Sequence, residues 1–114
     1  MGIESIFTNH IRTDENSRNE LIHPLSLKTG LKNAKKRLFD FFNENNFFNV
    51  DFNEEYGEIY AEQYPYEVTC YLSMSDSTTL VNVLFYNTEG RKKRKEFVQL
   101  LEMMREALSD ILNK

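Results

Sequence analysis

The stretch Pro65–Asn87 reads PYEVTCYLSMSDSTTLVNVLFYN and decides the fold, because apolar and polar residues alternate along both of its halves. A period of two residues is typical of a half-buried strand. Ser75–Ser77 supplies turn residues between the two halves, so we predict an antiparallel hairpin. Its inward face is expected to carry Tyr66, Val68, Cys70, Leu72, Met74, Thr79, Val81, Val83 and Phe85.

A hairpin alone would be unstable in water, so other elements must cover its apolar face. One helix is predicted before it in the sequence and one after it. The first follows Thr29, its expected N-cap, has its apolar residues on one side, and should end near Asn45–Asn46. After Gly90 the apolar residues recur in steps of four and three. That spacing predicts the longest helix of the chain, to about Asn113, with one face toward the core.

Two further strands are predicted between the first helix and the hairpin, at 48–52 and 58–62, and Leu21–Leu27 can add an edge strand at most, because Pro24 lacks an N–H group. The fold class is therefore α+β. We expect a two-layer sandwich, an antiparallel meander of about four strands with the N-terminal and C-terminal helices packed on one face. Residues 21–114 form this single domain, and residues 1–20 are expected to be a short helix and a loop.

Composition fits one small domain with separate acidic and basic zones. The chain has 114 residues, 40% of them hydrophobic, and a formal net charge of −4. Most bases lie in Lys28–Arg37 and Arg91–Lys95, whereas 51–67 holds acids and no base. The first nine residues lack the pattern of a secretory signal, no apolar run is long enough for a membrane span, and the single cysteine suits a reducing compartment. We therefore expect a cytoplasmic protein.

No pattern of catalytic or metal-binding residues stands out, so we predict no catalytic residue, no metal and no cofactor. Two histidines and one cysteine have no spacing typical of a metal site. A nucleophilic pair would need Cys70 beside His10 or His23, but Cys70 has the inward parity of a strand. Glu54, Glu55 and Glu58 surround a turn, where solvated carboxylates are the simpler interpretation.

The outward face of the predicted sheet is the first candidate site. It carries Tyr60, Tyr71, Leu84 and Tyr86 among polar residues, and no predicted element is left to cover it. A solvated face with scattered tyrosines is one interpretation, since tyrosine favours strands. A surface that binds a protein partner or a second copy is the other, because tyrosine is enriched at interfaces.

The second candidate is a run of five bases, Arg91, Lys92, Lys93, Arg94 and Lys95, expected in the first turns of the last helix. Cations there oppose the helix dipole, so helix stability does not explain them. A charged solvated turn paired with Glu89 and Glu96 is one interpretation, and an anion-binding site is the other. Bases near a tyrosine-bearing sheet also fit single-stranded nucleic acid, but acids on the same face argue against that partner.

The run from Ala34 through Leu108, with its two helices, its hairpin and the phrase NEEYGEIYAE at 53–62, resembles small bacterial domains of helix-grip type, which also occur as repeats in outer-membrane lipoproteins. That resemblance implies no catalytic residues, and the lipoprotein signal is not present, so an envelope location is not implied. The architecture is also similar to that of secretion chaperones. We therefore expect a non-enzymatic interaction module that binds itself or another protein, and a weak nucleic-acid or phosphate binder is the alternative.

Overall fold

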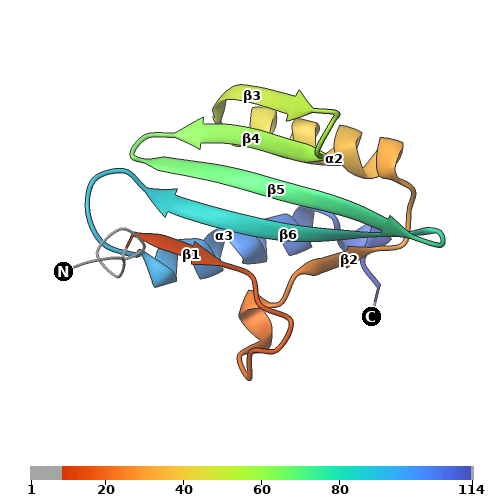
Figure 1. The fold of residues 1–114 in the computed structure, drawn as a ribbon, viewed down its shortest axis with the longest axis horizontal. Coiled ribbons are helices and arrows are strands. Elements are labelled where there is room, and N and C mark those ends of the chain that lie inside the picture. Colours follow the sequence, from red (N-terminus) through yellow and green to blue (C-terminus); the bar gives the residue numbers. More distant parts are fainter. Residues whose placement is uncertain (1–8, 114) are drawn as a thin grey trace.

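The computed structural model describes residues 9–113 and has an α+β fold, with a six-stranded antiparallel sheet and two α-helices (Figure 1). The helices are α2 (Leu31–Glu44) and α3 (Arg94–Ala107), and two short 3₁₀ helices are η1 (Glu20–Ile22) and η2 (Ser109–Ile111). The strands are β1 (His10–Arg12), β2 (Leu25–Leu27), β3 (Phe48–Asn53), β4 (Glu58–Gln63), β5 (Tyr66–Ser75) and β6 (Thr78–Asn87).

The predicted hairpin is confirmed as the pair β5 and β6, which lie at the centre of the sheet. Their register runs without a break from the pair Tyr66 and Asn87 to the pair Ser75 and Thr78. Asp76 closes the turn with a φ of +56°, a conformation that Asp tolerates. The strand order is β1-β6-β5-β4-β3, so the meander β3 to β6 is one sequential unit.

The sheet has six strands, so the expected number of about four was wrong. The two additional strands, β1 and β2, both pair with β6, through Ile11 opposite Phe85 and Ser26 opposite Leu80. Each is three residues long, too short for a period of two to be visible in the sequence. The edge strand expected near Pro24 is confirmed only over Leu25–Leu27.

The expected helix in residues 1–20 is not found where the structure can be described. Ile11, one of the residues whose spacing indicated it, lies in β1, and residues 1–8 are outside the described part of the chain. Leu21 and Ile22 belong to η1 instead of the edge strand. Asn19 caps η1, because its side chain accepts a hydrogen bond from the backbone N–H of Leu21 at 3.0 Å.

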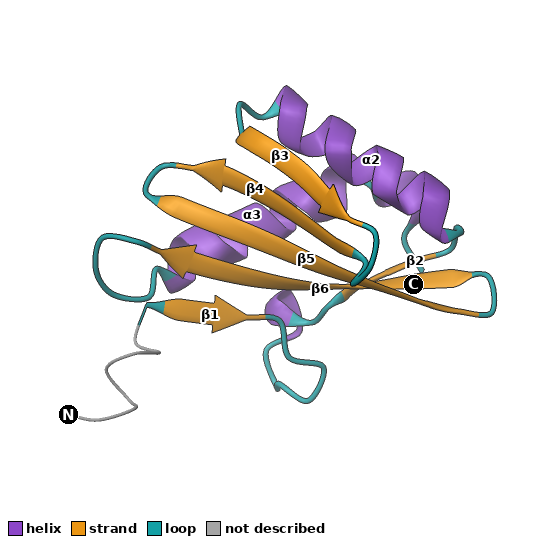
Figure 2. Ribbon diagram, turned by 45° about the horizontal axis from the view of Figure 1, so that its top comes forward, coloured by secondary structure: helices purple, strands orange, loops and turns teal. Residues whose placement is uncertain are grey.

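The hydrophobic core is one cluster that contains residues of both helices and of the strands. In Figure 1, α3 is drawn behind the strands β5 and β6, and Figure 2 shows α2 beside β3. The predicted parity is correct for most of the hairpin, but Met74 is 54% exposed because it sits near the far tip of β5. The helix residues that are buried are Ala34, Leu38, Phe41 and Phe42 of α2 and Phe97, Leu100, Leu101 and Met104 of α3. The buried strand residues include Ile59, Ala61, Val68, Cys70, Leu72, Val81, Val83 and Phe85.

Both helices begin later than the sequence predicted. Gly30 is the N-cap of α2, while the Thr29 hydroxyl accepts a hydrogen bond from the Asn33 amide at 3.0 Å. The end of α2 at Glu44 agrees with the prediction. The last helix ends at Ala107, short of the predicted Asn113.

Beyond α3 the chain turns to cover the edge of β2. Leu112 forms an isolated antiparallel bridge with Leu27. The backbone N–H of Lys28 donates to the carbonyl of Ile111 at 2.7 Å, and that of Asn113 donates to Ser26 at 2.8 Å. An edge strand that is paired in this way offers fewer free groups to another chain.

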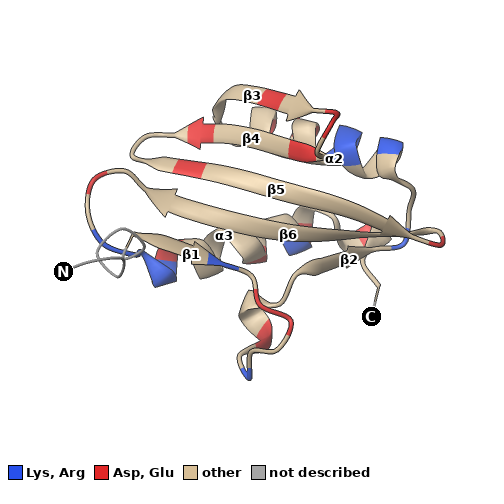
Figure 3. Cartoon of the chain, in the orientation of Figure 1, with Lys and Arg blue, Asp and Glu red and all other residues tan. Residues whose placement is uncertain are grey.

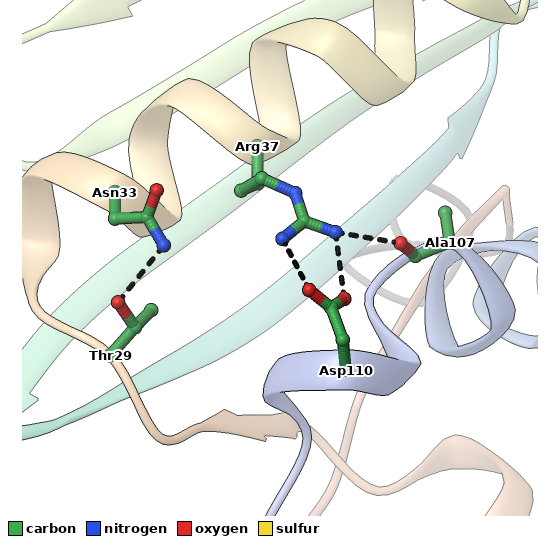
Figure 4. Close-up of polar contacts among 5 residues, drawn as sticks. All are labelled: Thr29, Asn33, Arg37, Ala107 and Asp110. Atoms are coloured by element: carbon green, nitrogen blue, oxygen red, sulfur yellow. Dashed lines mark hydrogen bonds and ion pairs between the residues drawn. The ribbon is translucent and has the colours of Figure 1, made fainter.

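An ion pair between α2 and η2 fixes this C-terminal segment (Figure 4). The Arg37 guanidinium donates to both carboxylate oxygens of Asp110, at 2.9 and 2.8 Å, and to the carbonyl of Ala107 at 3.0 Å. The hydrogen bond from Arg37 lowers the pKa of Asp110 below its usual value, and the same bond raises the pKa of Arg37. The pair therefore stabilises the folded chain above the ordinary pKa of Asp, and this contribution is lost as the pH falls through the lowered pKa.

We expect Arg37→Met to lower the melting temperature at neutral pH by up to about 5 °C, since the pair lies at the surface. The matched control is Lys36→Met, which removes an ion pair with Asp40 inside the same helix and is expected to have a smaller effect. Thermal scans by circular dichroism measure both. Equal effects at neutral pH, or a difference between wild type and Arg37→Met that persists in strong acid, would contradict this role.

Candidate protein-interaction face

The outer sheet face consists of the residues that alternate with the buried strand residues, and all four predicted interface residues belong to it. Tyr60, Leu84 and Tyr86 are half-buried, and Tyr71 is 41% exposed. The strand register arranges the face in three rows that run from β3 toward β1. The rows are Asn53, Glu58, Tyr71 and Asn82; Asp51, Tyr60, Thr69, Leu84 and Arg12; and Phe48, Glu62, Glu67, Tyr86 and His10.

Charge changes sign across the outer sheet face (Figure 3). The acidic residues Asp51, Glu58, Glu62 and Glu67 lie on β3, β4 and β5. Arg12 lies on β1, at the opposite end of the row that begins with Asp51. The face therefore has an acidic side on β3, β4 and β5, and its basic side consists of Arg12, beside which Asp14 and Glu15 line the same recess.

Tyr60 is held in place by hydrogen bonds on the acidic side. Its hydroxyl donates to Glu62 Oε2 at 2.6 Å, and the Asn49 amide donates to Glu62 Oε1 at 3.0 Å. Desolvation, and then the bond to Glu62, raise the pKa of Tyr60. The bond from Tyr60 lowers the pKa of Glu62 below its usual value. The ring of Tyr60 is thus fixed before any partner binds, which lowers the entropy cost of binding.

Tyr86 is fixed by a ring contact that the sequence did not predict. The imidazole of His10 stacks on it, with ring centroids 4.2 Å apart and planes 13° from parallel. His10 and Arg12 join the outer sheet face only because β1 pairs with β6. The only local signal was Ile11 between two polar residues, which is too short to predict a strand.

The expectation that nothing in the chain covers the outer sheet face needs correction. A pocket of about 500 Å³ opens on this face, and Thr13–Asn16 forms one wall of it. Tyr71, Leu80 and Leu84 line the sheet side. The loop is anchored to β6, because the Thr13 hydroxyl donates to Asn82 Oδ1 at 2.9 Å and accepts from the backbone N–H of Val83 at 3.0 Å. Tyr71 and Leu84 therefore share one recess, which neither Tyr60 nor Tyr86 lines.

The basic run lies on the surface, but the structure corrects its place relative to the helix. Arg91 and Lys92 precede α3, Lys93 is its N-cap, and only Arg94 and Lys95 lie in its first turn. All five residues are exposed. Within residues 9–113 none of the five side chains forms an ion pair, so the expected pairing with Glu89 and Glu96 is not found.

Cys70 cannot act with His10, because the two side chains lie on opposite faces of the sheet. Cys70 is fully buried on the inner face, opposite Ile59 and Val83 in the register. His10 stacks on Tyr86, which belongs to the outer sheet face. Burial raises the pKa of the Cys70 thiol to about 12, which leaves it as an unreactive thiol at neutral pH.

Comparison with known proteins adds no identification. No protein-family model matches the chain, and no curated protein or solved structure matches it. Neither α2 nor α3, the two α-helices that the structure describes, is long and apolar enough to cross a membrane.

Proposed function

We propose that this chain is a non-enzymatic protein-interaction module whose outer sheet face binds a second copy of the same chain. The proposal includes a two-layer arrangement in which both helices cover the inner face of the sheet and leave the other face for the partner. The observation that carries it is the change of charge across the outer sheet face, from Asp51 on β3 to Arg12 on β1. A face with one acidic side and one basic side can be complementary to itself.

Two-fold symmetry specifies how such a face would meet its copy. If the axis runs along the central strand β5, each strand faces its mirror position in the strand order, so β1 lies over β3 and β6 over β4 of the partner. Within one row, Arg12 then faces Asp51 of the copy, and Leu84 faces Tyr60. An axis perpendicular to the strands would instead place acids over acids.

Close to the axis, the same symmetry creates one unfavourable contact and one aromatic contact. Both Tyr71 and Glu67 lie on β5, close to the axis, so each is expected to face its own copy. Two tyrosines in contact bury a large area at little entropic cost. Two facing carboxylates repel each other, so Glu67 limits the affinity.

Sedimentation velocity at micromolar concentration tests the proposal. We expect a dimer in wild type, and a dissociation constant at least about tenfold higher in Arg12→Glu and in Tyr71→Glu. Glu67→Gln is expected to tighten the dimer. The matched control is Lys95→Glu, a charge reversal away from the face, which should leave the affinity unchanged.

A charge swap separates a second copy from a different protein partner. The double variant Arg12→Glu with Asp51→Arg exchanges the two ends of one row, so it should restore the dimer that Arg12→Glu weakens. A monomer at every concentration, or a double variant weaker than Arg12→Glu alone, would contradict binding of a second copy. Binding of a different protein, as in secretion chaperones, would then become the better explanation of the same face.

The proposal has two further parts, the location and the likeness of the fold. A cytoplasmic location is proposed from the single buried thiol of Cys70, which suits a reducing compartment. Likeness to helix-grip domains is proposed from the order of helix, strands and helix alone.

Single-stranded nucleic acid is the second candidate, since the five bases from Arg91 to Lys95 have no ion pairs in the described part of the chain. The acids of the outer sheet face oppose a polyanion there. We expect no binding of an oligonucleotide at physiological salt. A micromolar affinity that falls with salt by a log-log slope of about −0.7 per phosphate neutralised, and that is lost on charge reversal of Lys93 and Arg94, would favour this candidate.

A further inference from the structure

A second pocket, of about 710 Å³, lies between β1 and the segment that leads into α3. Three cationic side chains line it: Arg12 from β1, Lys92 from the segment before α3, and Arg94 from the first position of α3. Apolar residues Ile11, Ile22 and Leu84 line it as well. The volume is within the range typical of small-molecule sites. The sequence alone gave no reason to place Arg12 with the basic run, because about 80 residues separate them.

The charge of this pocket is not neutralised by the rest of the described chain. None of the three cations forms an ion pair within residues 9–113. The one carboxylate among the lining residues is Asp14, and its Oδ1 already accepts a hydrogen bond from the backbone N–H of Asn16 at 2.9 Å. The pocket therefore presents an excess of positive charge beside an apolar wall.

Hydrogen bonds, two of them partly buried, hold both sides of the pocket in position. On one side, Asn87 is 2% exposed, and its amide donates to the carbonyl of Arg91 at 2.9 Å, next to Lys92. Asn87 Oδ1 also accepts from the backbone N–H of Glu89 at 3.1 Å. On the other side, the backbone N–H of Thr13 donates to Val83 at 3.0 Å, which continues the pairing of β1 with β6. The backbones that carry the three cations are thus set before a ligand arrives.

We propose that this pocket binds a small organic phosphate, with the phosphate group among Arg12, Lys92 and Arg94 and the organic part against the apolar wall. Guanidinium groups bind phosphate oxygens in a bidentate geometry, and an ammonium group adds a point charge. An inorganic anion would use only the cations, whereas the half-buried Leu84 and the small exposed parts of Ile11 and Ile22, each 8% exposed, favour a ligand with an apolar or aromatic body. This site shares Arg12 and Leu84 with the proposed dimer interface, whereas Lys92 and Arg94 lie outside the outer sheet face and belong to the pocket alone.

Isothermal titration calorimetry with phenyl phosphate tests the proposal on the full chain. We expect saturable binding of phenyl phosphate, weaker binding of inorganic phosphate, and no measurable binding of phenol. Lys92→Gln and Arg94→Gln should each weaken binding of phenyl phosphate by about tenfold. The matched controls are Lys93→Gln and Lys95→Gln, which remove the same charge from the same run but do not line the pocket.

Several outcomes would contradict the proposal that this pocket binds an organic phosphate. Equal losses in the controls would mean a diffuse electrostatic effect, and equal binding of inorganic phosphate would remove the role of the apolar wall. Binding of an oligonucleotide far more tightly than phenyl phosphate would favour nucleic acid instead. Sedimentation of Lys92→Gln and Arg94→Gln keeps this test separate from the dimer, because both variants should dimerise as wild type does.

Discussion

Phe42→Ala is expected to destabilise the domain by about 3 to 5 kcal/mol, because it removes a fully buried ring where α2 meets the sheet. The ring of Phe42 makes edge contacts with Phe41 and Phe47, at centroid distances of 5.4 and 4.9 Å. A domain of this size is stable by only about 5 to 15 kcal/mol, so the variant should be close to unfolding. Urea unfolding followed by circular dichroism measures the loss.

The matched control for this prediction is Phe48→Ala. Phe48 is an aromatic residue one position after Phe47, but it lies on the edge strand β3 and is 64% exposed. We expect its removal to change the free energy of unfolding by no more than about 0.5 kcal/mol. Similar losses in the two variants would mean that the ring of Phe42 is not packed in the core as described.

The central hairpin could be predicted because the alternation of apolar and polar residues that indicates it is local and repeats along both strands. β5 and β6 each have ten residues, and the alternation of buried and less buried positions holds over the whole of β6. The same parity placed Tyr60, Tyr71, Leu84 and Tyr86 on one face. Where the pattern failed, at Met74, the strand extends toward a tip that is exposed to solvent.

Of the two N-terminal strands, β1 could not be predicted and β2 only as an optional edge strand, because their partner lies far away in the sequence. His10–Arg12 and Leu25–Leu27 are strands because β6 offers them an edge to pair with. Neither stretch has enough residues to show a period. The position of β1 matters for both proposed sites, since Arg12 lines both of these pockets and forms the basic side of the outer sheet face.

The last helix was predicted too long for a related reason. Leu108, Ile111 and Leu112 continue the apolar pattern of α3, and Leu108 is 1% exposed. The apolar pattern indicates which residues contact the core. That contact continues after the helix ends, because η2 and Leu112 pack along β2. Hydrophobic periodicity therefore predicted which side chains are buried better than it predicted where the helix stops.

Cys70 is expected to react with a thiol reagent at least about a thousandfold more slowly in the folded chain than in concentrated guanidinium chloride. At about pH 8, the shift of its pKa from 9.0 to about 12 alone lowers the thiolate fraction by about that factor. The side chain is also fully buried, so the reagent must wait for the sheet to open. Absorbance of the released leaving group measures the rate.

The matched control carries its thiol on the other face of the same strand. Ser73 is exposed and has the outward parity of β5, so the double variant Cys70→Ala with Ser73→Cys should react as fast as an unfolded thiol. Equal protection of the two thiols would contradict the assignment of the inner and outer faces.

Protection of Cys70 also decides how the dimer experiments are interpreted. Tyr71 is the next residue along β5, so Tyr71→Glu could weaken association either by disrupting the interface or by loosening the strand. If Tyr71→Glu sediments as a monomer while Cys70 stays protected, the strand is intact and the lost contact belongs to the outer sheet face. If Cys70 becomes reactive in the same variant, local unfolding explains the loss of the dimer, and the tyrosine is a structural residue and not an interface residue.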